Sequence, residues 1–109
     1  MVVAEGANVD GLISFAYPLH QPGHPEKSRI EHLPSIKIPA LFVSGTRDTF
    51  GTPQEIKAAA ELVPGSTVHI LNEADHGFAV PKNSIRTKAE VYGEAVDVLL
   101  VWAESHLRV

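Results

Sequence analysis

Two short apolar runs, separated by a helical segment, constrain the fold of this chain more than any other feature. The runs are Ala40 to Ser44 and Thr67 to Leu71, and each is largely continuous in apolar character rather than alternating. Such strands are typical of a parallel sheet that is covered on both faces. Because parallel strands need a long crossover connection, the sequence predicts a right-handed β-α-β unit over Ala40 to Leu71.

The segment between the two runs carries the local signals of a helix. Thr52 is a suitable N-cap, Pro53 fits the first helical position, and Glu55 stands where a capping box needs it. The pair Pro64-Gly65 is expected to end the helix. Four apolar residues at helical spacing form the predicted buried stripe, namely Ile56, Ala59, Ala60 and Val63.

The rest of the chain adds a third strand and a long helix. Gly11 to Tyr17 is expected to be the third strand, and a proline-rich loop with a short helical turn around Ser28 to Leu33 follows it. Asn83 to Leu107 has helical periodicity with two adjacent apolar stripes, so a wide buried face is expected. The first stripe is Ile85, Ala89, Tyr92, Val96, Leu99, Ala103 and Leu107, and the second is Val91, Ala95, Val98 and Trp102.

Composition narrows the functional classes. A length of 109 residues suits one domain or part of one. The net charge of −4 gives no sign of the basic surface patch that would bind nucleic acid or an anionic membrane. There are no cysteines, which excludes disulfides and thiolate metal sites. The N-terminal residues show no signal peptide, and the longest apolar run is far short of the ~20 residues that span a bilayer. A cytoplasmic location is expected.

An acid and a base follow the two strands of the β-α-β unit. Asp48 comes shortly after the first strand and His76 shortly after the second. The carboxyl ends of parallel strands lie at one edge of a sheet, where such folds place their functional residues. An aspartate that accepts a hydrogen bond from imidazole Nδ1 prepares the other nitrogen to take a proton. The alternative is that Asp48 merely caps a turn and His76 is a surface loop residue.

These residues resemble the C-terminal half of an α/β-hydrolase, of the small lidless kind related to dienelactone hydrolase. Gly45-Thr46-Arg47-Asp48 is similar to the strand exit that carries the triad acid, and Asp75-His76-Gly77 to the loop that carries the histidine. The similarity runs from about Val9 to the C-terminus, and Tyr17-Pro18-Leu19 suits the exit of the preceding strand. The resemblance implies that Asp48 is the acid and His76 the base.

The resemblance also implies a fold and a domain organisation. The expected fold is α/β, a three-stranded parallel sheet with flanking helices that corresponds to the last three strands of an α/β-hydrolase. Residues 1–109 would form a single partial domain, the C-terminal portion of the whole.

The nucleophile of that family is absent from the sequence. The serine should lie in a G-x-S-x-G motif on a strand-to-helix elbow, and no serine here has glycines at those positions. Ser14 and Ser44 fall within predicted strands. We therefore expect a fragment, a truncated gene product or half of a two-chain assembly, with very little acyl transfer by this chain alone.

Other candidate residues surround the expected site. Tyr17, Phe50 and Phe78 are the predicted substrate-binding residues. His20, His24 and His32 match no metal-ligand spacing and are interpreted as solvated loop residues. No metal and no cofactor are expected.

We considered three hypotheses about the function. The first is part of a serine hydrolase acting on an ester or related acyl substrate. The alternative is a non-catalytic half-fold that self-associates, through the edge of Gly11 to Tyr17 or by exchange of the last helix. A homo-oligomer is expected in either case, and nucleic acid or membrane partners are not. A response-regulator-like binding domain is disfavoured, because the acidic cluster and late lysine that it needs are missing.

Overall fold

A computed structural model describes residues 11–24 and 30–106 as one parallel sheet with helices on both faces. The strands lie in the order β1-β2-β3, with β1 at Leu12–Phe15, β2 at Ala40–Gly45 and β3 at Ser66–Leu71. Both neighbouring pairs are parallel. The predicted α/β architecture and its β-α-β unit are therefore confirmed.

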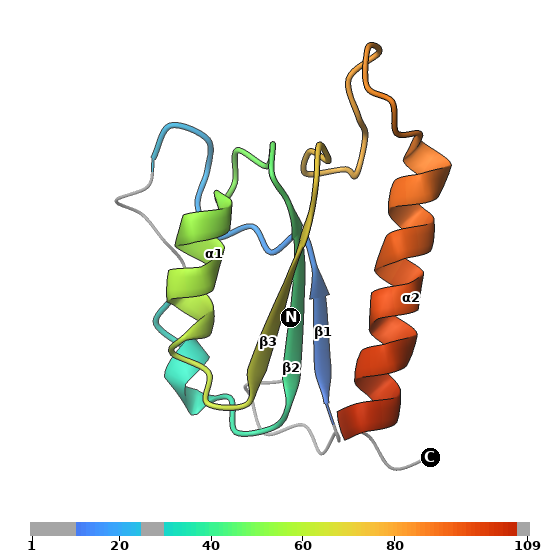
Figure 1. Ribbon diagram of the computed structural model, residues 1–109. Helices are drawn as coiled ribbons and strands as arrows, with labels where there is room; N and C mark the ends of the chain where they lie inside the picture. Colours follow the sequence, from blue (N-terminus) through green and yellow to red (C-terminus); the bar gives the residue numbers. More distant parts are fainter. Residues whose placement is uncertain (1–10, 25–29, 107–109) are drawn as a thin grey trace.

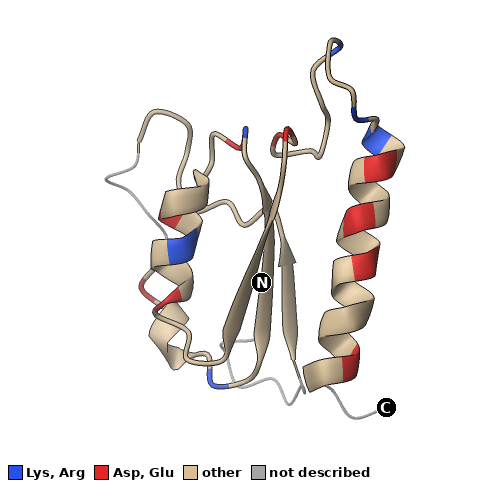
Figure 2. Cartoon of the chain, in the orientation of Figure 1, with Lys and Arg blue, Asp and Glu red and all other residues tan. Residues whose placement is uncertain are grey.

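Two helices cover opposite faces of this sheet (Figure 1). Helix α1, Pro53–Ala60, lies on one side together with the short 3-10 helix η3, Leu33–Ser35, and helix α2, Lys88–His106, lies on the other. The described residues 11–24 and 30–106 contain no helix that could span a membrane, and acidic residues occur along the length of α2 (Figure 2).

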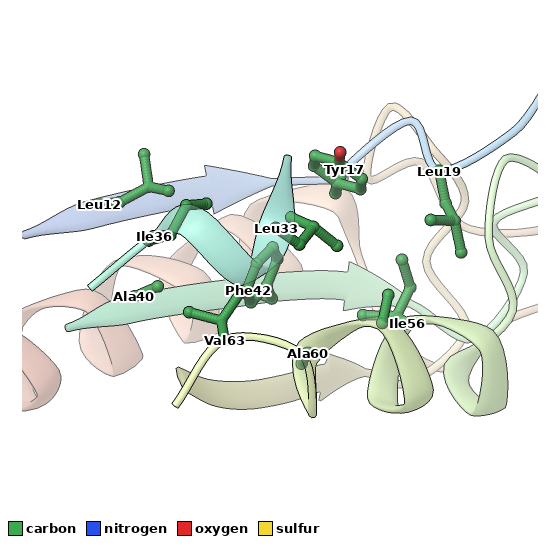
Figure 3. Close-up of a cluster of buried hydrophobic side chains, with 11 residues drawn as sticks. Leu12, Tyr17, Leu19, Leu33, Ile36, Ala40, Phe42, Ile56, Ala60 and Val63 are labelled. Carbon is green, nitrogen blue, oxygen red and sulfur yellow. The ribbon is translucent and has the colours of Figure 1, made fainter. Parts of the chain in front are cut away.

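The strand β2 shows why the sheet is apolar on both faces. Its residues point alternately to either side, so Ala40 and Phe42 join the core under α1 (Figure 3), whereas Leu41 and Val43 join the core under α2. All six residues of β2 are buried. A strand that packs on both faces has no polar side, which explains the continuous apolar run in the sequence.

Helix α1 begins as its sequence predicts and ends earlier. Thr52 Oγ1 accepts a hydrogen bond from the amide of Glu55 at 3.3 Å, and Glu55 Oε1 accepts one from the amide of Thr52 at 2.9 Å. The helix stops at Ala60, before the predicted Pro64-Gly65, because its last turns tighten. There the amides of Leu62 and Val63 bond the carbonyls three residues before them.

Helix α2 begins at Lys88 rather than at Asn83, so the predicted start was wrong by five residues. Thr87 and Glu90 form a reciprocal cap, in which each backbone amide donates to the other side chain at 2.9 Å and 3.1 Å. This capping pair fixes the first turn. Ile85 therefore lies outside the helix, with 97% of its surface exposed.

Only one of the two predicted apolar stripes of α2 packs on the sheet. Val91, Ala95 and Trp102 are buried against it. The other stripe is open to solvent over much of its length, with Tyr92 46% and Val96 49% exposed. The wide buried face that the sequence predicts is thus half covered within the described residues.

The carboxylate of Glu94 links helix α2 to β3, the strand at one edge of the sheet. Glu94 Oε2 lies 2.6 Å from Nε2 of His69 on β3, and Glu94 Oε1 lies 2.5 Å from Nη2 of Arg86. The contact with His69, followed by that with Arg86, holds the pKa of Glu94 below its ordinary value of 4.5. The ionised carboxylate is therefore the form that stabilises the fold.

Replacing Glu94 with glutamine is expected to lower the free energy of unfolding at pH 7 by about 1 kcal/mol. Because the folded pKa of Glu94 lies below the unfolded one, its contribution is complete above pH 4.5 and is lost as the pH falls through the folded value. The stability difference between wild type and variant should therefore disappear in acid. Urea unfolding from pH 3 to pH 7 measures it, with Glu104→Gln on the same helix as control. A difference that is independent of pH would contradict the prediction.

Candidate active site

Asp48 and His76 lie side by side at the carboxyl edge of the sheet, after β2 and β3. His76 Nδ1 donates to both oxygens of Asp48, at 3.0 Å to Oδ2 and 3.1 Å to Oδ1. The carboxylate side chain is fully buried and the imidazole is 37% exposed. Since a carboxylate can only accept, this geometry assigns the proton to Nδ1 and leaves Nε2 of the neutral ring with a lone pair. The structure thus brings together the two residues that the strand exits single out.

The two loops touch closely because Gly45 has no side chain. The Arg47 amide donates to the carbonyl of Ala74 at 2.9 Å, and the Glu73 amide donates to Thr46 Oγ1 at 2.8 Å. A Cβ atom added to Gly45 would lie 2.1 Å from the carbonyl oxygen of Ala74. The backbone of the segment after β2 therefore packs directly against the backbone of the segment after β3. This contact sets the separation of Asp48 and His76.

Asp75 shapes the loop that presents His76, a role that the sequence analysis missed. Its Oδ1 accepts from the amides of Gly77 and Ala79, both at 2.9 Å. The turn holds Phe78 at a φ of 64°, which is unusual for a residue with a side chain. The signal was present, because an aspartate often accepts a hydrogen bond from the backbone amide two residues on, and in Asp75-His76-Gly77 that residue is a glycine, which is common in turns.

Phe50 contacts both members of the pair. Its amide donates to Asp48 Oδ1 at 2.8 Å, and its ring stacks on that of His76 with centroids 4.1 Å apart and planes inclined by 27°. The predicted substrate-binding residue Phe50 thus lies against the imidazole. Among the described residues, the imidazole of His76 contacts a hydrogen-bond partner in Asp48 and an aromatic partner in Phe50.

An apolar hollow of about 350 Å³ adjoins His76, between the end of β1 and helix α2. Its walls include Phe15, Phe78, Tyr92, Val96 and Leu99. Phe78, the second predicted substrate-binding residue, therefore shares the hollow with His76. Tyr17, the third, does not, since it is buried in the cluster under α1 on the other side of the sheet.

Ser14 and Ser44, the two serines singled out in the sequence, do not contact the Asp48–His76 pair as a nucleophile would. Ser14 lies within β1 and Ser44 within β2, and neither hydrogen-bonds to His76 in the part of the chain that the structure describes. Within those same residues, the Oγ atom of Ser44 is buried without a hydrogen-bond partner. Both serines are therefore components of strands, as the sequence predicts.

The loop histidine His20 differs from its interpretation as a solvated residue. No group of three or more potential ligands that could hold a metal occurs in residues 11–24 and 30–106. His20 was expected to be solvated, but it is only 5% exposed and its Nε2 lies 2.9 Å from Glu55 Oε1. Glu55 is 35 residues away in the sequence, so no local spacing of residues predicts this contact.

A parallel sheet covered by helices, with an aspartate and a histidine joined at its carboxyl edge, has the form expected for an α/β protein of hydrolase type. Comparison with known families gives the same result over nearly the whole chain. Residues 1–104 match the profile of a family described as "Alpha/beta hydrolase domain". The chain belongs to this family.

Proposed function

We propose that this chain supplies the acid and the base of a serine hydrolase that acts on an ester or related acyl substrate. The observation that carries the proposal is the hydrogen bond from His76 Nδ1 to the buried carboxylate of Asp48, beside an apolar hollow. Asp48 is the acid that orients the ring, and His76 is the proton-transfer group. The serine and the donors of the oxyanion hole come from residues outside the 109 of this chain.

The geometry suits a defined sequence of proton transfers. His76 Nε2 accepts the hydroxyl proton of the serine while the serine oxygen forms a bond to the substrate carbonyl carbon. The imidazolium then returns this proton to the leaving alkoxide as the acyl–oxygen bond breaks. A water molecule repeats the sequence to release the acid. Throughout, Asp48 stays ionised and stabilises the imidazolium, and the ring of Phe50 holds the plane of the imidazole.

The hollow beside His76 supports a proposal for the substrate class. Its walls are aliphatic and aromatic side chains, among them Phe15, Phe78 and Leu99. Such a surface favours an apolar acyl or alkyl group over a charged one. We propose that this group of the ester occupies the hollow, with Phe78 as a wall. Contact of substrate with Tyr17 remains a prediction from the sequence.

A fluorophosphonate probe tests the proposed chemistry, because it labels only an activated serine. The 109-residue chain alone should not be labelled. Expressed together with the reading frame immediately upstream of its first codon, the chain should support labelling of a serine in a G-x-S-x-G motif. His76→Gln should abolish the labelling, and the matched control His24→Gln, at an exposed position, should leave it intact. Labelling that survives His76→Gln would refute the assignment of the base.

A second function, a self-associating module without catalysis, is favoured by a different observation. The outer edge of β1 has no neighbouring strand among the described residues, and next to it Phe15, Tyr92 and Val96 are 45–49% exposed. Open strand edges and apolar faces of this kind promote association between chains. We propose that two copies associate through this face when no other polypeptide covers it.

Sedimentation velocity at micromolar concentration is expected to show a dimer. Val96→Glu should convert it to a monomer, since a charge would be buried in the interface, while Ala58→Glu on the exposed side of α1 should not. A wild-type chain that sediments as a monomer at this concentration would exclude the module.

A further inference from the structure

The buried histidine of the loop after β1 is held by two oxygen atoms. His20 Nε2 lies 2.9 Å from Glu55 Oε1, and His20 Nδ1 lies 2.8 Å from the carbonyl oxygen of Gln21. Both oxygens are acceptors, so the ring satisfies both contacts when it is doubly protonated. A buried charge of this kind is costly without a partner, and Glu55 provides the opposite charge. The bonds from the Thr52 amide and, second, from His20 hold the pKa of Glu55 below its ordinary value.

His20 and Glu55 together hold residues 50–52, the short segment between Asp48 and α1, in place. The amide of His20 donates to the carbonyl oxygen of Phe50 at 2.9 Å. Glu55 Oε1, the same atom that bonds His20, accepts from the amide of Thr52 at 2.9 Å. One end of residues 50–52 is therefore held by the backbone amide of His20 and the other by the side chain of Glu55. The imidazole of His20 joins these two anchors through its bond to Glu55.

Residues 50–52 include Phe50, whose contacts orient the imidazole of His76. Phe50 stacks on the ring, and its amide fixes the carboxylate of Asp48. A displacement of residues 50–52 would move the stacking partner and the carboxylate together. Misplacement of a reacting group by about 1 Å can cost on the order of 10²-fold in rate.

We propose that His20 is a positioning residue for the Asp48–His76 pair, acting through Glu55 and the segment of residues 50–52. The hydrogen bonds described for His20 go to Gln21, Glu55 and Phe50, and it does not line the hollow, so its influence on the pair passes through Phe50. The meaning of this positioning for catalysis depends on the proposed hydrolase function, but the geometric claim does not. The two can therefore fail separately.

The test is NMR of the full 109-residue chain with ¹⁵N-labelled histidine, which needs neither a serine nor a substrate. In the wild type, the His76 signals should show the Nδ1–H tautomer and a ring-current shift from Phe50. His20→Leu removes the bond to Glu55, so the signals should shift toward a mixture of tautomers and the ring-current shift should be lost. His20→Gln, which can still donate to Glu55, should restore both signals in part.

Two further variants keep the proposal falsifiable. His24→Leu, in the same loop and exposed, should leave the His76 signals unchanged. Glu55→Gln retains an acceptor for the helix cap but loses the charge that holds His20, and it serves if His20→Leu does not fold. Far-UV circular dichroism confirms that each variant is folded. Unchanged His76 signals in folded His20→Leu, or in Glu55→Gln if only that variant folds, would overturn the proposal, as would an equal change in His24→Leu.

Discussion

Replacing Gly45 with alanine is expected to lower the free energy of unfolding by about 1–3 kcal/mol, the usual cost of inserting a group into a filled space. The new Cβ would lie 2.1 Å from the carbonyl oxygen of Ala74 and 2.9 Å from the Ala74 side chain. The first of these is a backbone atom, which cannot rotate away. The exits of β2 and β3 must therefore separate, and the bond from the Arg47 amide to Ala74 must stretch.

Gly93 offers the matched control for this substitution. It lies in α2, and nothing stands within 4 Å of the position that its Cβ would occupy. Gly93→Ala is therefore expected to raise the free energy of unfolding by up to about 1 kcal/mol, through helix propensity alone. Urea denaturation of the two variants gives both values. Equal effects at positions 45 and 93 would show that the contact with Ala74 does not constrain the loops.

Replacing Asp48 with asparagine is expected to lower the activity of the assembled hydrolase strongly. The amide keeps the shape of the carboxylate, but its NH₂ group can donate to His76 Nδ1 and so favours the tautomer with the proton on Nε2. That tautomer cannot accept a proton from a serine. A triad with this change loses about 10⁴-fold in kcat, and we expect a loss of that order in the assembled hydrolase.

The tautomer change can be observed in this chain without any activity. The ¹⁵N shifts of His76 should indicate Nδ1–H in the wild type and Nε2–H in Asp48→Asn. Asp97→Asn makes the same change of charge at an exposed position of α2 and should leave the shifts of His76 as they are. If Asp48→Asn also leaves them unchanged, the bond between Asp48 and His76 does not determine the tautomer.

The parts of the structure that the sequence predicted are those set by local signals or by topology. The start of α1 follows from Thr52 and Glu55, three residues apart, whose reciprocal bonds need no other part of the chain. The meeting of Asp48 and His76 follows from the parallel connection, which places both strand exits at one edge. Neither inference requires knowledge of how distant side chains pack.

The parts that were missed depend on packing between distant segments. Two apolar stripes in α2 have similar periodicity, and only the placement of the helix on the sheet decides that Val91 is buried and Val96 is not. His20 lies in a loop without periodicity, and its partner Glu55 is 35 residues further along the chain, in helix α1. Such pairings are determined by the folded arrangement and leave no mark in the spacing of residues.

The contacts of Phe50 have a consequence for how an active centre could be completed. Its amide and its ring fix the carboxylate and the imidazole within one small unit. The rotational freedom of His76 is thus already restricted when that unit has folded, before any hydroxyl group arrives. A separate polypeptide that carried the serine hydroxyl would therefore need to align only its own hydroxyl with His76. Such preorganisation favours reconstitution of an active centre from two polypeptides.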